Sequence, residues 1–154
     1  MADEVLRKFS YGLYVLGVKA GDIVNGMTAS LVSQVSIDPP RVMVAVHRDR
    51  FTHGLVKEAG IFSLSVLRKD QAHLMGKFKG SKEVTDNAIN GVEIEYAGGG
   101  VPVLKESAGY VVCRLSQMVD AGDHTIFIGD VEESVAGEGP ALNVEDLGGH
   151  TYGG

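Results

Sequence analysis

Hydrophobic residues alternate with polar ones, or run together, in short segments along most of this chain. Six segments show such a pattern over the length of a strand, at residues 14–18, 23–36, 41–47, 61–67, 108–121 and 125–135. The segment at 41–47 is almost continuously apolar, which indicates a well-buried strand. Gly122-Asp123-His124 joins the two longest segments and predicts a hairpin, because a short loop containing Gly separates two alternating runs.

Two or three short peripheral helices are expected, each from a capping residue followed by apolar positions at helical spacing. The first begins at Asp3, the second at Thr52 and the third at Asp70. The second covers residues 53–59 and ends at Gly60, which suits the left-handed conformation that closes many helices. Apolar residues share one face in the first and third helices: Val5, Leu6 and Phe9, and then Leu74, Met75 and Phe78.

The remaining stretches are polar or rich in glycine. Residues 80–91 predict a polar excursion, and the segment from Gly137 onward has little apolar periodicity. We expect a C-terminal tail over 137–154, with a loose end at 148–154. No linker or internal repeat divides the chain, so residues 1–154 are expected to form one domain. Hairpin-type connections without repeated βαβ units favour a mainly β, closed or nearly closed antiparallel barrel.

Composition narrows the classes of function. The 154 residues include 14 Lys and Arg against 20 Asp and Glu, and this net charge of −6 argues against nucleic acid as a partner. No apolar run approaches the ~20 residues that span a bilayer, and the charged N-terminus lacks the apolar stretch of a signal peptide. A cytoplasmic protein without a membrane partner is therefore expected. The single cysteine, Cys113, excludes an internal disulfide and is interpreted as a small buried residue, with a nucleophile as the alternative.

The first candidate for chemistry is Asn25-Gly26-Met27-Thr28-Ala29-Ser30, continuing to Ser33, Gln34 and Ser36. Small hydroxyl side chains and a glycine on a strand leave room for a flat ligand against the backbone. Backbone N–H and hydroxyl groups can then bond polar ring atoms or a phosphate. The alternative interpretation is an ordinary solvent-facing strand, since many of these are rich in Thr and Ser.

Three loops carry cations or histidine. The loop at 47–53 (His-Arg-Asp-Arg-Phe-Thr-His) precedes a predicted helix and suits an anion, or is a solvated charged turn. Lys77-Phe78-Lys79-Gly80 supplies cations for a phosphate, or complements the dipole at a helix C-terminus. His124, at the predicted hairpin tip, either faces a cleft and donates to a pyrophosphate or an amide, or is simply exposed.

Several common sites are excluded by their missing motifs. The five histidines show no zinc spacing and no cysteine cluster accompanies them, so no metal is expected. There is no P-loop and no G-x-G-x-x-G after a strand, which argues against a Rossmann nucleotide domain. The G-x-S-x-G elbow of the α/β-hydrolases is also missing.

The first candidate segment, read on through Val35-Ser36-Ile37-Asp38-Pro39-Pro40, resembles the flavin reductase family, whose fold is the FMN-binding split barrel. In that family a Gly-Met-Thr-Ala stretch is followed by Ser-x-Asp-Pro-Pro, as in this chain. The similarity continues through Thr52-His53, residues 62–67, Phe78-Lys79-Gly80 and residues 122–129. The order and spacing of these pieces agree over roughly residues 5–135.

The resemblance implies an antiparallel Greek-key split β-barrel that forms a homodimer and holds FMN, or FAD, near the subunit interface. It implies that four consecutive residues lie along the isoalloxazine ring: Met27, Thr28, Ala29 and Ser30. The ribityl phosphate would be faced by a strand end and two loops: Val46, His47, Arg48 and Thr52, with Lys79 and Gly80 nearby. His124 would lie near the nicotinamide nucleotide.

The resemblance further implies NAD(P)H-dependent reduction of the flavin by hydride transfer, a step that requires no side-chain acid or base. The electrons would then pass to a monooxygenase or to a small redox protein. Two departures from the family pattern are Ser30-Leu31, where Asn-Ser is common, and Gly139-Pro140-Ala141-Leu142, which only echoes Pro-Leu-x-Tyr. They leave two alternatives: an FMN-binding electron-transfer module without its own NAD(P)H activity, and a non-flavin barrel that serves as an interaction domain.

Overall fold

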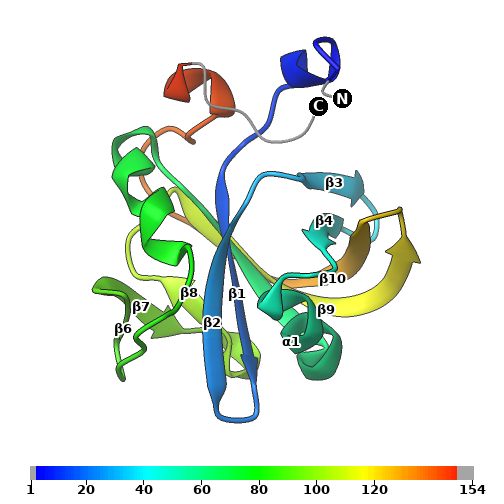
Figure 1. Cartoon of the computed structure of the whole chain (residues 1–154). Helices are drawn as coiled ribbons and strands as arrows, with labels where there is room; N and C mark the ends of the chain where they lie inside the picture. Colours follow the sequence, from blue (N-terminus) through cyan, green and yellow to red (C-terminus); the bar gives the residue numbers. More distant parts are fainter. Residues whose placement is uncertain (1–2, 149–154) are drawn as a thin grey trace.

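The computed structural model describes residues 3–148, which fold mainly into antiparallel strands (Figure 1). Seven strands form one large sheet: β1 (Tyr14–Ala20), β2 (Ile23–Ala29), β3 (Val32–Ser36), β4 (Arg41–His47), β5 (Ile61–Val66), β9 (Gly109–Asp120) and β10 (His124–Ala136). Three short strands form a small sheet: β6 (Ala88–Ile89), β7 (Val92–Tyr96) and β8 (Pro102–Leu104). The helical elements are the α-helix α1 (Phe51–Ala59) and the 3₁₀ segments η1 (Leu6–Lys8), η2 (Lys69–Phe78), η3 (Gly98–Gly100) and η4 (Val144–Leu147).

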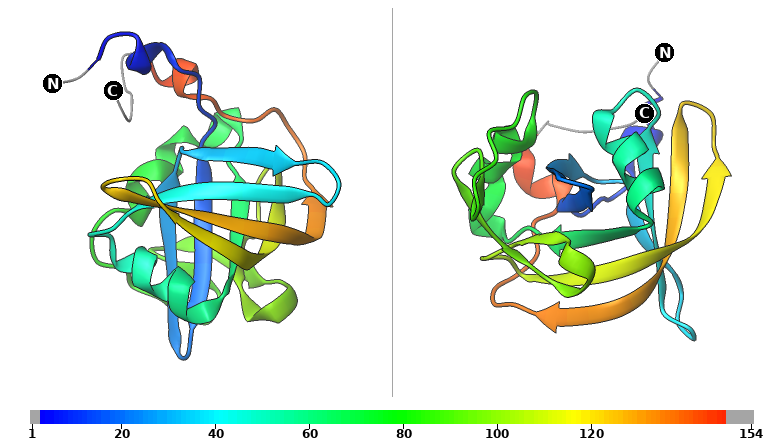
Figure 2. Two further views of the ribbon diagram at one scale, coloured as in Figure 1. Left: turned by 90° about the vertical axis from the view of Figure 1, so that its right-hand side faces the viewer. Right: turned by 90° about the horizontal axis from the view of Figure 1, so that it is seen from below.

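The large sheet curls round until its two edge strands are neighbours in the sequence. Its order is β2-β1-β5-β9-β10-β4-β3 with antiparallel pairing throughout, and only Ser30 and Leu31 separate β2 from β3. The Ala45 N–H of β4 donates to the Leu31 carbonyl at 2.9 Å, which holds this connector against the far side of the sheet. Figure 2 shows the curvature. The antiparallel β architecture is confirmed, but the single strand expected over 23–36 is two strands on opposite edges.

The hairpin of β9 and β10 confirms the strongest turn signal in the sequence. Its register shifts twice, between Ile128 and Gly129 and between Val131 and Glu133. Such irregularities bend a strand and increase its twist, which suits a sheet that must curl. Glycine is needed at Gly129, because a Cβ there would lie 2.7 Å from the Cβ of Cys113 and 3.1 Å from the Phe62 ring.

Two hydrophobic cores lie on the two faces of β1. Successive side chains of a strand point to opposite faces, so Leu16 enters one core and Val15 enters the other. The first, here called the sheet core, is enclosed by the curled sheet and by Leu55 and Val56 of α1. Its other buried members are Val18, Ala20, Ala29, Val44, Val46, Phe62, Leu64, Cys113 and Phe127. Cys113 has no exposed surface, which confirms its interpretation as a buried residue.

The second core, here called the flank core, lies among β1, η2, the small sheet and residues 140–147. Its buried members are Leu13, Val15, Leu67, Phe78, Ile89, Ile94, Leu104 and Leu142. Leu142 is 1% exposed; its carbonyl accepts from the Leu13 N–H at 3.1 Å, and its N–H donates to the Leu67 carbonyl at 2.8 Å. Residues 140–147, expected to belong to a tail, are therefore packed into the fold. The loose end expected at 148–154 falls, from residue 149 onward, outside the described residues.

The N-cap of the second predicted helix lies two residues before the expected one. Its N-cap is Arg50, so Thr52 lies inside α1, where its hydroxyl accepts a hydrogen bond from Asn25 Nδ2 at 3.3 Å. Thr52 is consequently buried and joins the helix to β2. Gly60 ends α1 with a φ of +69°, as the sequence predicts.

The other two predicted helices are 3₁₀ segments. At the start of η2, Gln71 Oε1 accepts the Arg68 N–H at 2.9 Å, whereas Asp70 bonds the Arg68 side chain and is not the cap. The Asp3 carboxylate accepts the Val5 N–H at 2.8 Å just before η1, but the N-cap of η1 is Val5, so the predicted cap at Asp3 is wrong. The apolar residues expected to share one face of the first helix are exposed: Val5, Leu6 and Phe9. No helix within residues 3–148 is long and apolar enough to cross a membrane.

Candidate functional site

Two pockets open next to each other along β2. The first has a volume of about 300 Å³ and is lined by Leu13, Met27, Thr28, Ala29, Ser30, Leu31, Ala45, His47, Arg50, Met75, Phe78, Lys79, Val144 and Leu147. The second has a volume of about 660 Å³ and is lined by Ile23, Val24, Asn25, Met27, Asp49, Arg50, Phe51, Thr52, Phe78, Gly80, Ser81, Lys82 and Val84. Because Met27, Arg50 and Phe78 line both, the two pockets form one groove.

The groove follows the free edge of β2. Residues 27–31 all line the first pocket, although alternate side chains of a strand point to opposite faces. In the described chain β2 has a strand partner only on its β1 side. Edge strands present unpaired backbone N–H and C=O groups, so the groove offers both donors and acceptors to a flat polar ring.

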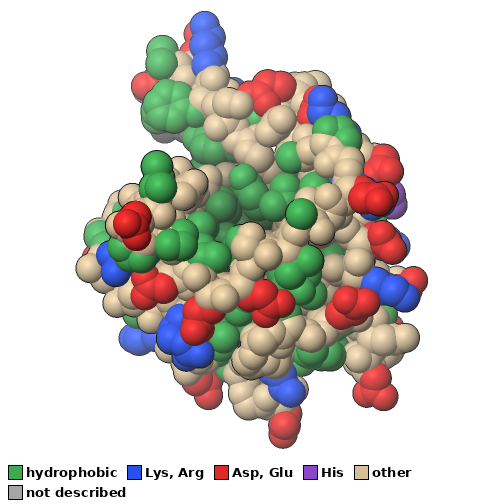
Figure 3. Space-filling view, turned by 180° about the vertical axis from the view of Figure 1, so that it is seen from behind, with side chains coloured by type: hydrophobic (Ala, Val, Ile, Leu, Met, Phe, Trp, Pro, Cys, Tyr) green, Lys and Arg blue, Asp and Glu red, His purple; other side chains and the backbone are tan. Residues whose placement is uncertain are grey.

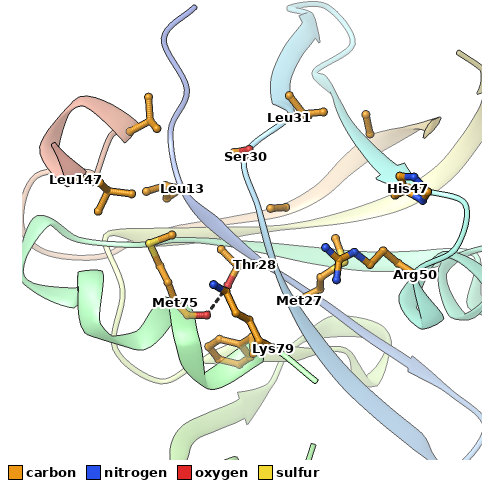
Figure 4. A pocket seen from close by; sticks show the side chains of 14 residues that line it. Leu13, Met27, Thr28, Ser30, Leu31, His47, Arg50, Met75, Lys79 and Leu147 are labelled. Atoms are coloured by element: carbon orange, nitrogen blue, oxygen red, sulfur yellow. Dashed lines mark hydrogen bonds between the residues drawn. The ribbon is translucent and has the colours of Figure 1, made fainter. Parts of the chain in front are cut away.

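The first pocket has an apolar end and a cationic end, as Figure 4 shows. Leu13, Met75 and Leu147 form the apolar end, and His47 and Arg50 lie at the opposite end. The Thr28 hydroxyl donates to the Met75 carbonyl at 3.1 Å, which fixes η2 against β2. One wall of the pocket is therefore the sheet edge, and the other is assembled from segments near both ends of the chain.

The second pocket is cationic and more open. Lys82 Nζ donates to the Gly80 carbonyl at 2.6 Å, which holds the ammonium group beside Arg50. Burial, and then the positive charge of Arg50, lower the pKa of Lys82. Within residues 3–148 neither Arg50 nor Lys82 takes part in an ion pair, and Asp49 is the only carboxylate among the lining residues. The groove therefore carries local positive charge on a chain of net charge −6.

A pair of histidines stands at the cationic end of the first pocket. His47 ends β4 and His124 begins β10; they are register partners, with ring centroids 5.1 Å apart in an edge-on arrangement. Asp123 Oδ1 lies 2.8 Å from His124 Nδ1, and its other oxygen lies 3.8 Å from His47 Nε2. The hydrogen bond from His124 is the main cause that lowers the pKa of Asp123. His47 lines the pocket, whereas His124 is not among the lining residues.

The structure brings most of the predicted site residues together. The first pocket contains Met27, Thr28, Ala29, Ser30, His47 and Lys79, and the second contains Thr52 and Gly80. Val46 lines neither pocket, because its side chain points into the sheet core and is fully buried. Arg48 is exposed and also lines neither; its backbone N–H donates to the Asp123 carbonyl at 2.9 Å. The hydroxyl and amide residues expected to continue the site on β3 are likewise outside both pockets: Ser33, Gln34 and Ser36.

Sequence reasoning missed several lining residues. Arg50 belongs to the cationic loop but is not among the residues predicted to bind the phosphate. The Arg50 N–H donates to the His47 carbonyl at 3.0 Å and closes a turn, and Arg50 rather than Arg48 lines the groove. Lys82 lay in the supposed polar excursion. Val144 and Leu147 gave no periodic signal, because a single 3₁₀ turn is too short to show one.

Neither a metal cluster nor a reactive thiol adds to this site. Among residues 3–148, no group of three or more His, Cys, Asp or Glu side chains is arranged to hold a metal ion. Burial raises the pKa of the Cys113 thiol to about 12. The nucleophilic alternative for Cys113 therefore has no support in the geometry, because the thiolate is the reactive form.

Known proteins share this sequence and fold. A family model described as "Flavin reductase like domain" matches residues 6–146. A high molecular weight rubredoxin from Moorella thermoacetica is 35% identical over 87% of this chain and 59% of its own length. A ferric-chelate reductase (NAD(P)H) from Archaeoglobus fulgidus is 30% identical over 93% of this chain and 86% of its own length. The chain thus spans 59% of the rubredoxin, and it spans 24% of a diflavin flavoprotein from Nostoc that is 32% identical to it.

Solved structures give the same result. The flavin reductase PheA2 superimposes with a TM-score of 0.78 and is 30% identical, covering 88% of this chain and 86% of its own. BorF, the flavin reductase component of a bacterial two-component tryptophan halogenase, has a TM-score of 0.81 and is 28% identical, covering 96% and 92%. With the family match extending over nearly all the described residues, the chain belongs to the flavin reductase-like family.

Proposed function

We propose that this protein is a flavoprotein oxidoreductase that binds FMN or FAD along the free edge of β2 and reduces it with NAD(P)H. The observation that carries this proposal is the groove itself: an open strand edge, a closed apolar end and a cationic end within one site. The family membership and the ferric-chelate reductase relative support the assignment.

The first pocket fits a flavin ring. Its volume of about 300 Å³ falls within the usual range of ligand pockets. Small side chains at Ala29 and Ser30 let a planar group approach the backbone of β2, whose free N–H and C=O groups match the donors and acceptors of a pyrimidine ring. A bound flavin supplies the hydride-accepting chemistry that the amino-acid side chains lack.

The chain's own residues hold and orient the ligand. Met27, Thr28, Ala29 and Ser30 would lie along the ring. The cationic residues Arg50 and Lys79 would neutralise a phosphate, with Thr52 and Gly80 farther along the groove. Leu13, Met75 and Leu147 would exclude water from the apolar end. No side chain is assigned as a general acid or base, since hydride delivery depends on the placement of two rings.

His124 is proposed to contact the pyridine nucleotide. Asp123 Oδ1 lies 2.8 Å from its Nδ1, which orients the imidazole ring beside His47. His47 lines the first pocket, and the His124 ring lies edge-on to the His47 ring. His124 is therefore one side chain away from the pocket in which a nicotinamide ring would stack on the flavin. A donor at this position would bind the pyrophosphate or the amide of NAD(P)H.

A homodimer and an electron acceptor complete the proposal. Hydrophobic side chains gather in a hollow on the face opposite to that of Figure 1, with charged side chains around it (Figure 3). Large exposed apolar patches mark protein–protein interfaces, which supports self-association. Light scattering should give twice the 16.3 kDa chain mass, and a monomer that still binds flavin would contradict the dimer. The match to BorF, the reductase component of a two-component halogenase, supports a separate partner enzyme as the electron acceptor. For this chain we propose a monooxygenase or a small redox protein in that role.

A second candidate is an FMN-binding electron-transfer module without its own NAD(P)H activity. It is favoured by the relatives in which this chain matches only part of a longer protein, at 59% of the rubredoxin and 24% of the diflavin flavoprotein. In those proteins the matched region has other parts of the same chain beside it.

An anaerobic titration separates the two candidates. The purified protein is loaded with FMN, NADH or NADPH is added, and the flavin absorbance near 450 nm is followed. Rapid bleaching supports the reductase, whereas bleaching only by a chemical reductant supports the electron-transfer module. Failure to bind either FMN or FAD would contradict both.

A further inference from the structure

One loop, over residues 77–83, contributes side chains to both pockets. Lys79 lines the first pocket, and Gly80, Ser81 and Lys82 line the second. The loop leaves the end of η2, where the last backbone carbonyls of a helical segment need partners from outside it. It then turns at Gly80, whose φ is +66°. The place of two cations in the groove therefore depends on how this loop is held.

One side chain outside both pockets bonds to the loop at three residues. Asn90 Nδ2 donates to the Lys77 carbonyl at 2.7 Å and to the Ser81 carbonyl at 3.3 Å. Asn90 Oδ1 accepts the Glu83 N–H at 2.6 Å, and the Asn90 N–H donates to the Glu83 carbonyl at 2.8 Å. These bonds reach both ends of the loop and a point between them, so the lining residues are carried on a fixed backbone.

The backbone at Asn90 has an unusual conformation. Its φ is +47°, and among residues 3–148 no other residue except glycine has a positive φ. Asn90 and Gly91 form the two-residue turn between β6 and β7, a place where asparagine is tolerated. Glycine meets the same requirement with less strain, so the turn by itself does not call for an asparagine side chain. The hydrogen bonds to the loop are what asparagine adds.

A fixed loop favours the binding of an anion. Lys82 Nζ donates to the Gly80 carbonyl, so the position of its ammonium group follows the loop backbone. Lys79 reaches the first pocket from the same loop (Figure 4). A cation that is already held in place binds a phosphate more tightly than one on a mobile loop, because ordering the loop on binding costs free energy. Asn90 lines neither pocket, so it would act through the loop backbone.

We propose that Asn90 is a positioning residue that sets the preference of the groove for phosphorylated over unphosphorylated flavin, by holding residues 77–83 in place. The inference rests on the proposed function, since it takes flavin as the ligand and places its phosphate at the cationic loop. FMN and riboflavin share the ring and the ribityl chain and differ only in the phosphate. The ratio of their affinities therefore isolates the end of the groove on which Asn90 would act.

The test measures the affinities for FMN and riboflavin by flavin fluorescence. Asn90→Gly keeps the turn and relieves the positive φ, but it removes all three side-chain hydrogen bonds. FMN binding should weaken about tenfold and riboflavin binding by less than about twofold. Asn87→Gly is the matched control and should change neither affinity, because Asn87 is exposed on the same segment and lines neither pocket.

A second pair of variants separates the hydrogen bonds from charge. Asn90→Asp keeps an acceptor for the Glu83 N–H but cannot donate to the Lys77 and Ser81 carbonyls, so it should also lower the ratio of FMN to riboflavin affinity. Asn87→Asp adds the same charge to the same segment, where the side chain contacts Thr85 instead of the loop. It should leave the ratio at the wild-type value.

Three results would overturn the proposal. They are a wild-type ratio in Asn90→Gly, an equal loss of both affinities in that variant, and a fall in Asn90→Asp no larger than that in Asn87→Asp. A wild type that binds riboflavin as tightly as FMN would also overturn it, but would leave flavin binding intact. A wild type that binds neither flavin would contradict the proposed function itself.

Discussion

The sheet core and the flank core are built by different means, and the difference explains how this fold makes a groove. The sheet core is enclosed mainly by strands that pair on both sides, namely β1, β4, β5, β9 and β10, together with α1. The flank core depends on 3₁₀ segments, very short strands and residues 140–147, which are joined to the rest by a few backbone hydrogen bonds. The first pocket takes its fixed side from β2 and its opposite side, including Leu13 and Leu147, from the flank. The large sheet, which supplies one side of the pocket, and the flank core, which supplies the other, are therefore stabilised separately.

The largest effect is expected in the sheet core. Phe62 is fully buried and contacts the position of Gly129, so Phe62→Ala leaves a cavity that neighbouring strands cannot close. We expect the free energy of unfolding to fall by about 3–5 kcal/mol. Chemical denaturation followed by circular dichroism measures it. A loss no greater than that caused by an exposed substitution such as Phe9→Ala would show that packing in the sheet core does not determine the stability of the fold.

Cys113 reports on the same core. Burial raises the pKa of its thiol to about 12, so the folded protein holds it protonated and inaccessible at pH 8. A thiol reagent should therefore label Cys113 only on unfolding, and faster in Phe62→Ala than in the wild type. Rapid labelling of the native wild type would contradict the assignment of Cys113 to a closed core.

Leu142→Ala tests whether the two cores unfold independently. A buried Leu→Ala change costs about 2–5 kcal/mol, but here the loss should appear first as local opening of residues 140–147. The Leu13 and Leu142 amides, which bond this segment to the rest, should exchange hydrogen faster, while amides in the β5–β9 ladder keep their protection. Cys113 labelling should stay slow, and flavin affinity should fall because Leu147 leaves the pocket wall. Equal loss of protection in both cores would show that they unfold as one unit.

Thr28→Val tests the contact between β2 and η2. It removes the hydrogen bond to the Met75 carbonyl while keeping the β-branched shape that suits a strand. We expect a loss of about 0.5–1.5 kcal/mol in stability and a weaker flavin complex. Thr85→Val, outside both pockets, is the control. Unchanged FMN affinity by fluorescence quenching would place Thr28 outside the flavin site.

His124→Ala should have the smallest effect on stability, within about 0.5 kcal/mol, because it lies at a hairpin end. The KM for NAD(P)H should rise about ten- to a hundredfold, since one charge-assisted hydrogen bond would be lost. The pKa of Asp123, now lowered mainly by His124, should move up toward its ordinary value in an NMR titration. His73 is exposed on η2 and lies outside both pockets, so His73→Ala should change neither the KM for NAD(P)H nor the pKa of Asp123. A normal KM would remove His124 from nucleotide binding.

The large sheet could be predicted from the sequence much better than the segments around the flank core. Strands such as 41–47 and the β9–β10 hairpin have strong local signals, namely apolar runs and a glycine turn, and the structure follows them. The small sheet and residues 140–147 have two to five residues per element, which is too few for a period to show. Their conformation depends on tertiary contacts such as those of Leu142, which no local pattern encodes.

The same limit applies to the site. Met27, Thr28, Ala29 and Ser30 were found because they are consecutive on one strand. Arg50 and Arg48 cannot be told apart by composition, because only the course of the loop decides which side chain faces the groove. The second pocket joins Lys82 to Phe51 across more than thirty positions of sequence, and no local pattern indicates that they meet.

The free edge of β2 has a consequence for how the protein behaves without its ligand. An unpaired strand edge is a template for pairing with another chain, and such pairing is a common start of aggregation. A ligand seated along that edge would occupy the same backbone groups and so act as a protective cover. The flavin-free protein should therefore be the form that precipitates on storage or during expression. Supplying riboflavin to the growing cells should raise the yield of protein that does not aggregate.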